Sequence, residues 1–322
     1  MSDVILGIDI AKKKFDAALL VREKIKHKVF PNTNKGFQTL AAWLNRQGVE
    51  RVHACMEPTN IYAEALASYL YDAGHRVSLV NPVRIKGYAQ SELSRNKTDK
   101  KDATVIARFC RAQQPAPWIP DPPEKRELQA LVRRLDALAA MRQQEKNRLE
   151  VASFQAVNSI HKLITFLDEE IEQIKSSIRE HIDRHPEFKA KQELLETIPG
   201  IGETTIAIIL AEFSSVELFG KARQMAAFIG VVPKHHCSGS SINKKARMSK
   251  TGRANLRKAL YMPAIVAKNH NPVIAAFCKR LEKVGKPKMA IIGAAMRKLV
   301  HIIFGVLKNK KPFDSDFAVI HA

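Results

Sequence analysis

Five prolines stand within nine residues, between positions 115 and 123, and they divide the chain into two parts of different character. Proline has no backbone N–H to donate and its ring disrupts a helix, so such a cluster predicts a boundary between folding units. Before the cluster, short apolar runs alternate with amphipathic segments; after it, helical periodicity dominates. We therefore predict a first domain over residues 1–118 and a largely helical remainder.

The first domain is predicted to be a mixed sheet covered by helices. Runs rich in β-branched residues predict strands near residues 4–10, 15–21, 26–30, 52–56 and 77–80. Periodic apolar residues predict helices from Asn34 onward, over residues 61–73 and over residues 98–112. Three early strands followed by alternating helix and strand are typical of an α/β fold.

The region after the prolines contains a heptad pattern. Six apolar residues alternate steps of four and three: Ile160, Ile164, Leu167, Ile171, Ile174 and Ile178. This seam predicts a long antiparallel helical hairpin or an intermolecular coiled coil, with an ordinary amphipathic helix as the alternative. We assign residues 119–185 to this coiled-coil region and residues 186–322 to a third, mostly α-helical domain.

Positive charge is concentrated at the end of the chain. The whole sequence has a net charge of +21, and residues 221–322 alone hold 21 Lys or Arg against 3 Asp or Glu, a net +18. Residues 1–220 carry only +3. Such an asymmetry predicts a nucleic-acid-binding region, with a generally basic soluble protein as the alternative.

Cysteine spacing and hydropathy indicate a cytoplasmic protein without membrane association. The four cysteines are widely scattered and show no zinc-ligand spacing, as expected of free thiols in a reducing compartment. The first residues lack the basic start of a signal peptide. The longest apolar segment, residues 289–307, is interrupted by Arg297, Lys298 and His301, which favours a buried or DNA-facing helix over a membrane span.

Four carboxylates stand where they can converge. Asp9 lies within a predicted buried strand, where an unpaired carboxylate is costly, and Glu57 follows another strand. Asp99 and Asp102 are three residues apart at the start of a predicted helix and share a face. Converging carboxylates repel unless divalent cations neutralise them, and oxygen ligands suit Mg²⁺. Two such ions about 4 Å apart can clamp the attacking and leaving oxygens of a phosphodiester.

Each acid also has a simpler structural interpretation. Asp99 or Thr98 can cap the helix, and Glu57 before Pro58 can be a surface loop residue. Asp9 is the hardest of the four to explain structurally. The ordered set therefore favours a metal site over four unrelated carboxylates.

The motifs that hold these acids resemble those of the DEDD transposases of bacterial insertion sequences. They are Gly7-Ile8-Asp9, Met56-Glu57-Pro58-Thr59 and Arg95-Asn96-Lys97-Thr98-Asp99-Lys100-Lys101-Asp102-Ala103. More narrowly, the chain resembles the insertion-sequence 110 family of bridge-RNA-guided recombinases, through residues 198–202, 228–233, 238–241, 247–250 and 260–263 as well. The resemblance implies a RuvC-like, RNase H fold for the first domain, with Mg²⁺ bound by Asp9, Glu57, Asp99 and Asp102.

The segment Ile198-Pro199-Gly200-Ile201-Gly202 resembles the hairpin of a helix-hairpin-helix. Gly200 and Gly202 would let the backbone approach a phosphate, and the amides of the following helix would point at it. Ile206 occupies a position that often holds alanine, a mild departure from the motif. A plain Pro-Gly turn between two helices is the alternative.

The tract Ser238-Gly239-Ser240-Ser241 looks, from its residues alone, like a flexible loop. A serine hydroxyl is a weak nucleophile that needs a base or a metal beside it. The family resemblance implies instead that Ser238 attacks the scissile phosphate and holds the DNA as a phosphoserine ester. Ser240 and Ser241 are lesser candidates.

Basic residues follow this tract and are candidates for phosphate contacts, which give affinity without sequence information. They are Lys244, Lys245, Arg247, Lys250, Arg253, Arg257 and Lys258, with Lys97 in the first domain. Few aromatic residues are interleaved with them, so base stacking is not the main device. This fits a protein that leaves base reading to a guide RNA, a partner that only the resemblance implies.

The predicted function is therefore an RNA-guided DNA recombinase or transposase of a bacterial insertion sequence, associated with the nucleoid when active. Its partners would be donor DNA, target DNA and a bridge RNA. The resemblance implies a dimer of dimers in which acids and serine meet from different subunits. One alternative is a RuvC-like metal nuclease or junction resolvase without a covalent intermediate, and another is a nucleic-acid-binding protein without catalysis.

Overall fold

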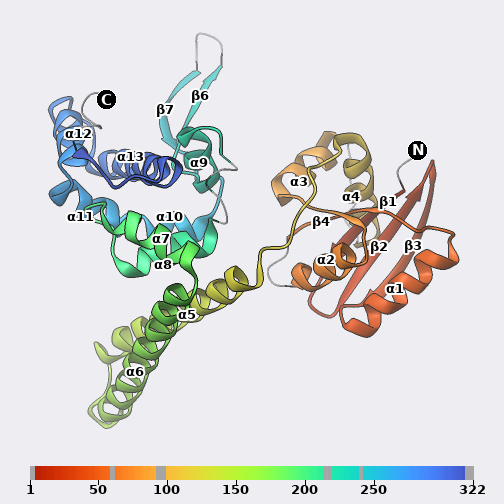
Figure 1. The fold of residues 1–322 in the computed structure, drawn as a ribbon, viewed down its shortest axis with the longest axis horizontal. Helices are drawn as coiled ribbons and strands as arrows, with labels where there is room; N and C mark the ends of the chain where they lie inside the picture. Colours follow the sequence, from red (N-terminus) through yellow and green to blue (C-terminus); the bar gives the residue numbers. More distant parts are fainter. Residues whose placement is uncertain are drawn as a thin grey trace. The chain divides into compact units, whose positions relative to one another are not determined.

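The structure is a computed structural model that describes residues 4–58, 62–91, 99–213, 216, 219–238 and 242–315, without the side chains of residues 99 and 235–246. The chain divides into two compact units, Met1–Pro120 and Asp121–Ala322 (Figure 1). The boundary falls within the proline cluster. Helices α5 (Pro123–Leu149) and α6 (Phe154–Arg184) belong to the second unit, and the heptad seam lies within α6. The division of that unit into two domains stays a prediction.

The first unit contains a five-stranded mixed sheet. Its strands are β1 (Ile5–Ile10), β2 (Lys14–Val21), β3 (Lys24–Pro31), β4 (His53–Met56) and β5 (Arg76–Leu79), in the order β3-β2-β1-β4-β5. β2 is antiparallel to both β1 and β3, whereas β1, β4 and β5 are parallel. The predicted mixed α/β architecture is confirmed, with the strand ends shifted by a few residues.

Helices cover both faces of the sheet (Figure 1). α1 (Asn34–Arg46) and α2 (Tyr62–Asp72) pack on the face that carries Leu6 and Ile8. α3 (Pro82–Ser91) and α4 (Asp99–Gln113) pack on the face that carries Ile5. The sequence patterns did not predict α3. Apolar side chains on both faces explain why β1 is a nearly continuous apolar run rather than an alternating one.

Gly7 fixes the distance between β1 and α4. A Cβ atom on Gly7 would lie 2.2 Å from the carbonyl oxygen of Ala103 and 2.4 Å from the backbone nitrogen of Ala107. The helix backbone therefore rests directly on the strand, and only glycine permits this contact. This close packing sets where the first turn of α4 lies relative to the end of β1.

The Gly7→Ala substitution is expected to destabilise the first unit by about 3 kcal/mol, because α4 must move away from the sheet. Urea unfolding followed by circular dichroism measures this change. Gly87→Ala in α3 is the matched control, since a Cβ there meets open space, and it should raise stability by about 0.5–1 kcal/mol through helix propensity. Equal stabilities for the two variants would show that α4 does not rest on β1.

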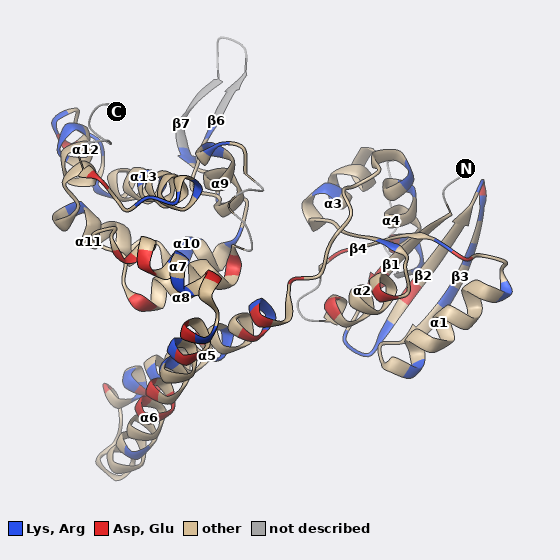
Figure 2. Ribbon diagram, viewed as in Figure 1, with Lys and Arg blue, Asp and Glu red and all other residues tan. Residues whose placement is uncertain are grey.

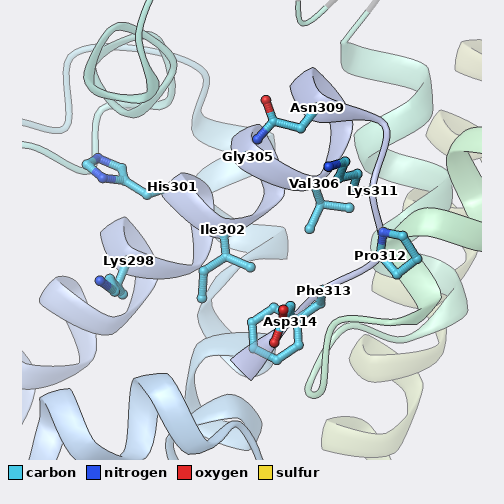
Figure 3. A pocket seen from close by; sticks show the side chains of 10 residues that line it. All are labelled: Lys298, His301, Ile302, Gly305, Val306, Asn309, Lys311, Pro312, Phe313 and Asp314. Atoms are coloured by element: carbon cyan, nitrogen blue, oxygen red, sulfur yellow. The ribbon is translucent and has the colours of Figure 1, made fainter. Parts of the chain in front are cut away.

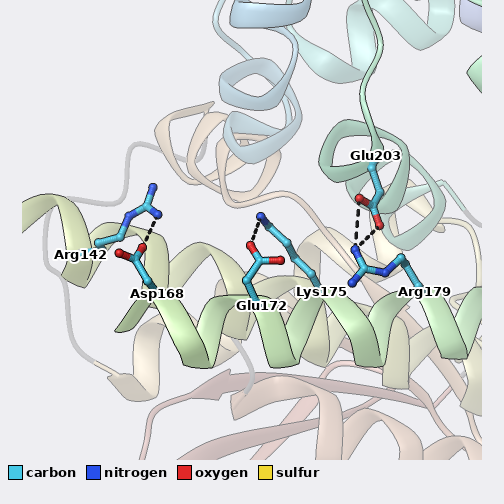
Figure 4. Close-up of polar contacts among 6 residues, drawn as sticks. All are labelled: Arg142, Asp168, Glu172, Lys175, Arg179 and Glu203. Carbon is cyan, nitrogen blue, oxygen red and sulfur yellow. Dashed lines mark hydrogen bonds and ion pairs between the residues drawn. The ribbon is translucent and has the colours of Figure 1, made fainter. Parts of the chain in front are cut away.

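The second unit begins with two long helices, α5 (Pro123–Leu149) and α6 (Phe154–Arg184). They lie antiparallel, because His181 near the end of α6 contacts the Glu124 carbonyl at the start of α5. Of the heptad seam, Leu167, Ile171 and Ile178 are buried. Figure 4 shows ion pairs on the surface of α6. Asp168 of α6 pairs with Arg142 of α5 at 2.7 Å, and Arg179 of α6 pairs at 3.1 Å with Glu203, the first residue of α8 (Glu203–Glu212).

The helices that follow share one apolar core with the α5–α6 hairpin. They are α7 (Pro186–Glu196), α8 (Glu203–Glu212), α9 (Ala222–Ile229), α10 (Ala254–Ala259), α11 (Tyr261–His270), α12 (Pro272–Lys283) and α13 (Lys288–Asn309). Between α9 and α10 lie the strands β6 (Pro233–Ser238) and β7 (Ile242–Met248). α13 is long and apolar enough to cross a membrane by length and composition alone. Its buried residues, including Leu299, Val300 and Ile303, belong to the core, as in a core helix of a soluble protein.

Of the tract Ser238-Gly239-Ser240-Ser241, the structure describes only Ser238, which lies in a strand; residues 239–241, and with them the predicted loop, lie outside the described residues. β6 and β7 form an antiparallel pair in which Ser238 lies opposite Ile242 and Cys237 lies opposite Asn243. Ser238 is thus the last residue of a strand. The tract contains too few apolar residues for a strand pattern, so cross-strand pairing was not visible in the sequence.

Candidate active site

Two of the predicted acids stand near the carboxyl ends of neighbouring parallel strands: Asp9 is the last residue but one of β1, and Glu57 follows the last residue of β4. Ile8 of β1 pairs with Met56 of β4. Asp9 and Glu57 are the next residues along their respective strands, so both stand at the carboxyl edge of the sheet. Both are half-buried.

α4 brings the other two acids toward the same edge. The Cys110 thiol, late in α4, contacts the His53 carbonyl at the start of β4, with Sγ and O separated by 4.0 Å. Ala103 lies over Gly7 in the middle of β1. The helix therefore runs antiparallel to both strands, and its first turn, with Asp99 and Asp102, lies toward their carboxyl ends.

Strand alternation places Asp9 on the face that α4 covers. Ile5 packs with the α3–α4 side of the sheet and Gly7 touches α4, so Asp9, two residues further, points to the same side. Cys55 is on this side of β4, and Glu57 follows it by two residues. Asp9, Glu57 and Asp102 thus come from three elements that meet at one edge.

The donor set fits a divalent cation of the magnesium type, because it consists of carboxylate oxygens alone. Among the described side chains, no three His, Cys, Asp or Glu residues gather closely enough to form a ready metal cluster. Asp9, Glu57 and Asp102 are among these described side chains, so their elements meet at one edge without forming a ready cluster of three carboxylates. The side chain of Asp99 lies outside the described residues. Lys97 also lies outside the described residues.

Asp16 is an acid that the sequence patterns missed. It is directly opposite Asp9 across the β1–β2 pair, is 9% exposed, and accepts a 3.3 Å hydrogen bond from Lys14. Like charges directly opposite each other in a sheet are destabilising, and the Lys14 ammonium offsets this repulsion. The signal was present in the sequence: Asp16 shares its strand face with Ala18 and Leu20, which pack toward α4.

His27 lies near Asp16 and the first turns of α4. His27 Nε2 lies 3.4 Å from the Thr104 hydroxyl of α4. Burial and the Lys100 ammonium lower the pKa of His27 below its usual value, while Asp16 acts in the opposite direction. His27 is therefore neutral at pH 7 and adds no positive charge to the acidic edge.

Cations surround the same edge. Lys12 and Lys13 are exposed in the turn that follows β1, and Lys100 and Lys101 are exposed in the first turn of α4. Carboxylates flanked by exposed lysines suit a phosphodiester, because the lysines attract the phosphates that the acids alone would repel.

The predicted serine and part of the basic set belong to the second unit. Backbone pairing places Ser238 at the end of β6 and both Lys244 and Lys245 in β7. Their side chains, with Ser240 and Ser241, lie outside the described residues. Arg247 and Lys250 are exposed. In Figure 2, red and blue residues are mixed along α5 to α8, whereas the charged residues of α9 to α13 are nearly all blue.

Three predicted phosphate ligands have partners within the protein. Arg257 is half-buried and donates to the carbonyl of Ile229 at 3.0 Å, at the turn where Gly230 has φ 85°. Lys258 pairs with Asp136 of α5 at 2.7 Å. Arg253 stacks over the Phe228 ring, with its guanidinium carbon 5.5 Å from the ring centroid. Arg257 therefore supports the turn after α9, whereas Arg253 and Lys258 remain largely exposed.

The two glycines of the predicted hairpin have different surroundings. Gly200 has φ 101° and touches α11, since a Cβ there would lie 2.8 Å from Ala267. A Cβ on Gly202 would meet nothing within 4 Å, and Gly202 precedes the first residue of α8. Glu203 already places an acid at that helix start, paired with Arg179. Gly200 thus has a packing role, and Gly202 is the glycine open to a phosphate.

Comparison with known proteins shows the family of the chain. A family model for DEDD transposases of the IS110 type matches residues 6–152, and the model of the IS116/IS110/IS902 transposase family matches residues 192–279. The chain is 35% identical to the pilin gene-inverting protein of Moraxella bovis, over 98% of both chains. It is 24% identical to the transposase for insertion sequence IS1328 of Yersinia enterocolitica, over 77% of this chain and 78% of that one. The chain is therefore a member of the IS110 family of transposases, enzymes that catalyse DNA strand transfer.

Proposed function

We propose that this transposase cleaves and rejoins DNA through a phosphoserine intermediate, with a RuvC-like first unit that holds Mg²⁺ and a second unit that donates Ser238. The convergence of Asp9, Glu57 and the first turn of α4 at one sheet edge carries the proposal. The strand order, in which β2 alone runs against the other four strands, supports an RNase H-type fold.

In the proposed reaction, Ser238 Oγ attacks the scissile phosphorus. One O–P bond forms, the P–O bond to the leaving deoxyribose oxygen breaks, and the proton lost by Ser238 is balanced by one gained at that oxygen. Attack on the phosphoserine by the hydroxyl of another strand reverses these changes and rejoins the DNA. When bound, Mg²⁺ would supply positive charge that offsets the negative charge developing during the displacement. Asp9, Glu57, Asp99 and Asp102 would hold it.

The substrates are proposed to be two DNA segments, donor and target, brought together by a bridge RNA. The +18 charge of residues 221–322 supports binding of a polyanion. The paucity of aromatic side chains beside the basic residues supports base reading by RNA rather than by protein. Because one relative is a pilin gene-inverting protein, inversion of a DNA segment is a proposed outcome alongside insertion.

We further propose a dimer of dimers in which acids and serine come from different protomers. If so, Asp102→Asn and Ser238→Ala proteins should each fail to cleave DNA alone but recover cleavage when mixed. In an equal mixture, about half of the sites receive an intact Asp102 and about half receive an intact Ser238. Random pairing of protomers therefore makes about one quarter of the composite sites fully intact. Gel assays of strand cleavage, with each variant alone as the control, measure the recovery. Absence of recovery after co-refolding would refute the exchange between protomers.

The alternative is a metal nuclease or junction resolvase in which water attacks and no covalent link forms. The same carboxylate edge would serve both reactions. They differ only in whether the cleaved phosphate becomes covalently linked to the protein. Ser238→Ala removes the phosphoserine route and leaves a water-dependent route unchanged, so cleavage by this variant separates the two reactions.

A further inference from the structure

A pocket with a volume of about 660 Å³ lies between α13 and the segment that follows it (Figure 3). Ile302 and Val306 line it from α13, and Phe313 lines it from the following segment. Figure 3 shows these apolar side chains between Lys298 at one end and Lys311 at the other. Neither the acids of the first unit nor the tract at Ser238 belongs to this pocket.

The wall opposite α13 is fixed by backbone contacts. Lys310 ends the helix in the left-handed conformation, with φ 51°. Lys311 then donates its backbone N–H to the Val306 carbonyl, with N and O separated by 3.3 Å. The Phe313 N–H donates to the Thr197 hydroxyl at 2.8 Å. These bonds fold the segment back against the unit and shape the pocket.

His301 contributes a polar group without a partner. Its Nε2 atom is buried and has no hydrogen-bond partner among the described residues. Burial, with Arg297 and Lys298, lowers the pKa of His301, so the ring is neutral at pH 7. A buried polar nitrogen left unpaired is costly. Because Nε2 is shielded from solvent, a ligand in the pocket would reach it only after the His301 ring turns.

We propose that this pocket receives one unpaired nucleotide of the DNA or RNA, an inference that rests on nucleic acid being the partner of this transposase. The base lies against Ile302, Val306 and Phe313, and its two flanking phosphates face Lys298 and Lys311. Asp314 also lines the pocket, and its carboxylate repels phosphate, which leaves the two lysines as the phosphate contacts.

Size and charge support this occupant over a neutral metabolite. Sites of about 300–1,000 Å³ hold ligands as large as a nucleotide. The surrounding region, residues 221–322, has the net charge of +18 that attracts a polyanion. Stacking of a base on a protein surface is sequence-tolerant, because every base has an aromatic face.

Filling the pocket tests the proposal. In the full chain, Ile302→Trp is expected to weaken binding of ten-nucleotide single strands containing 2-aminopurine by about tenfold. The change in 2-aminopurine fluorescence on binding should disappear, while the affinity for a blunt DNA duplex stays within twofold of wild type. Parallel titrations with DNA and RNA oligonucleotides show which strand supplies the nucleotide.

Two further variants, both at lysines, separate a loss of binding from a loss of folding. The Lys298→Ala, Lys311→Ala double variant should weaken single-strand binding about tenfold at low salt, and the difference from wild type should shrink as the salt concentration rises. Lys308→Ala is the matched control, because this exposed lysine lies on α13 outside the pocket, and it should change the affinity less than threefold. Wild-type fluorescence changes in both pocket variants would overturn the proposal, and DNA cleavage is not needed for the readout.

Discussion

Asp102→Asn is expected to reduce DNA strand cleavage by about a thousandfold, equivalent to roughly 4 kcal/mol of transition-state stabilisation. The side chain lies in the first turn of α4, directed by the Gly7 contact to the sheet edge that holds Asp9 and Glu57. Asparagine keeps the size of aspartate but removes the negative charge that a divalent cation requires. Asp9→Asn should have a similar effect, because it removes charge from the same edge.

The measurement is single-turnover cleavage of a radiolabelled substrate over a range of Mg²⁺ concentrations. Asp72→Asn is the matched control: Asp72 is an exposed acid at the end of α2 in the same unit, and its loss should leave the rate within twofold. Melting curves establish that all variants fold. Full cleavage by Asp102→Asn and Asp9→Asn would remove these acids from the mechanism.

Ser238→Ala is expected to abolish the covalent protein–DNA species and to lower strand cleavage below detection, at least about ten-thousandfold. The substitution removes only the hydroxyl at the end of β6 and keeps the β6–β7 pairing. Denaturing gels of the protein bound to nicked, end-labelled DNA detect the covalent species directly.

Ser240→Ala and Ser241→Ala serve as controls from the same tract. Both should retain cleavage and the covalent species, because the proposed nucleophile is Ser238. Unchanged cleavage by Ser238→Ala, with no covalent species in wild type, would favour the water-dependent nuclease. Loss of activity only in Ser240→Ala or Ser241→Ala would move the nucleophile by two or three residues.

The sheet of the first unit was predictable because its strands are apolar and bounded by turn residues. The segment around Ile8 is buried on both faces, so its continuous apolar run marked it clearly. α3 escaped prediction: Ile85 is its only buried residue, so the segment carries little helical periodicity. Likewise, β6 and β7 depend on pairing with each other rather than on an apolar pattern.

The candidate site was predictable to the extent that its residues stand at element ends. Asp9 and Glu57 could be placed at strand ends, but only the β1–β4 register shows that these ends are adjacent. Asp16 was missed because its position opposite Asp9 depends on the β1–β2 register, which a linear pattern does not display. Arg257 was assigned to phosphate binding as one of the basic residues that follow the serine tract. Its contact with the Ile229 carbonyl could not be predicted, because it requires the folded turn at Gly230.

Carboxylates of the first unit and Ser238 of the second are proposed to act in one chemical step. The decisive experiment traps the protein on a nicked DNA substrate and follows it by trypsin digestion and mass spectrometry. A nucleotide adduct is expected on Ser238, within the peptide of residues 235–244, formed by wild type with Mg²⁺ and absent from Asp9→Asn. An adduct on any other residue, or an equal yield of the Ser238 adduct from Asp9→Asn, would contradict this proposal.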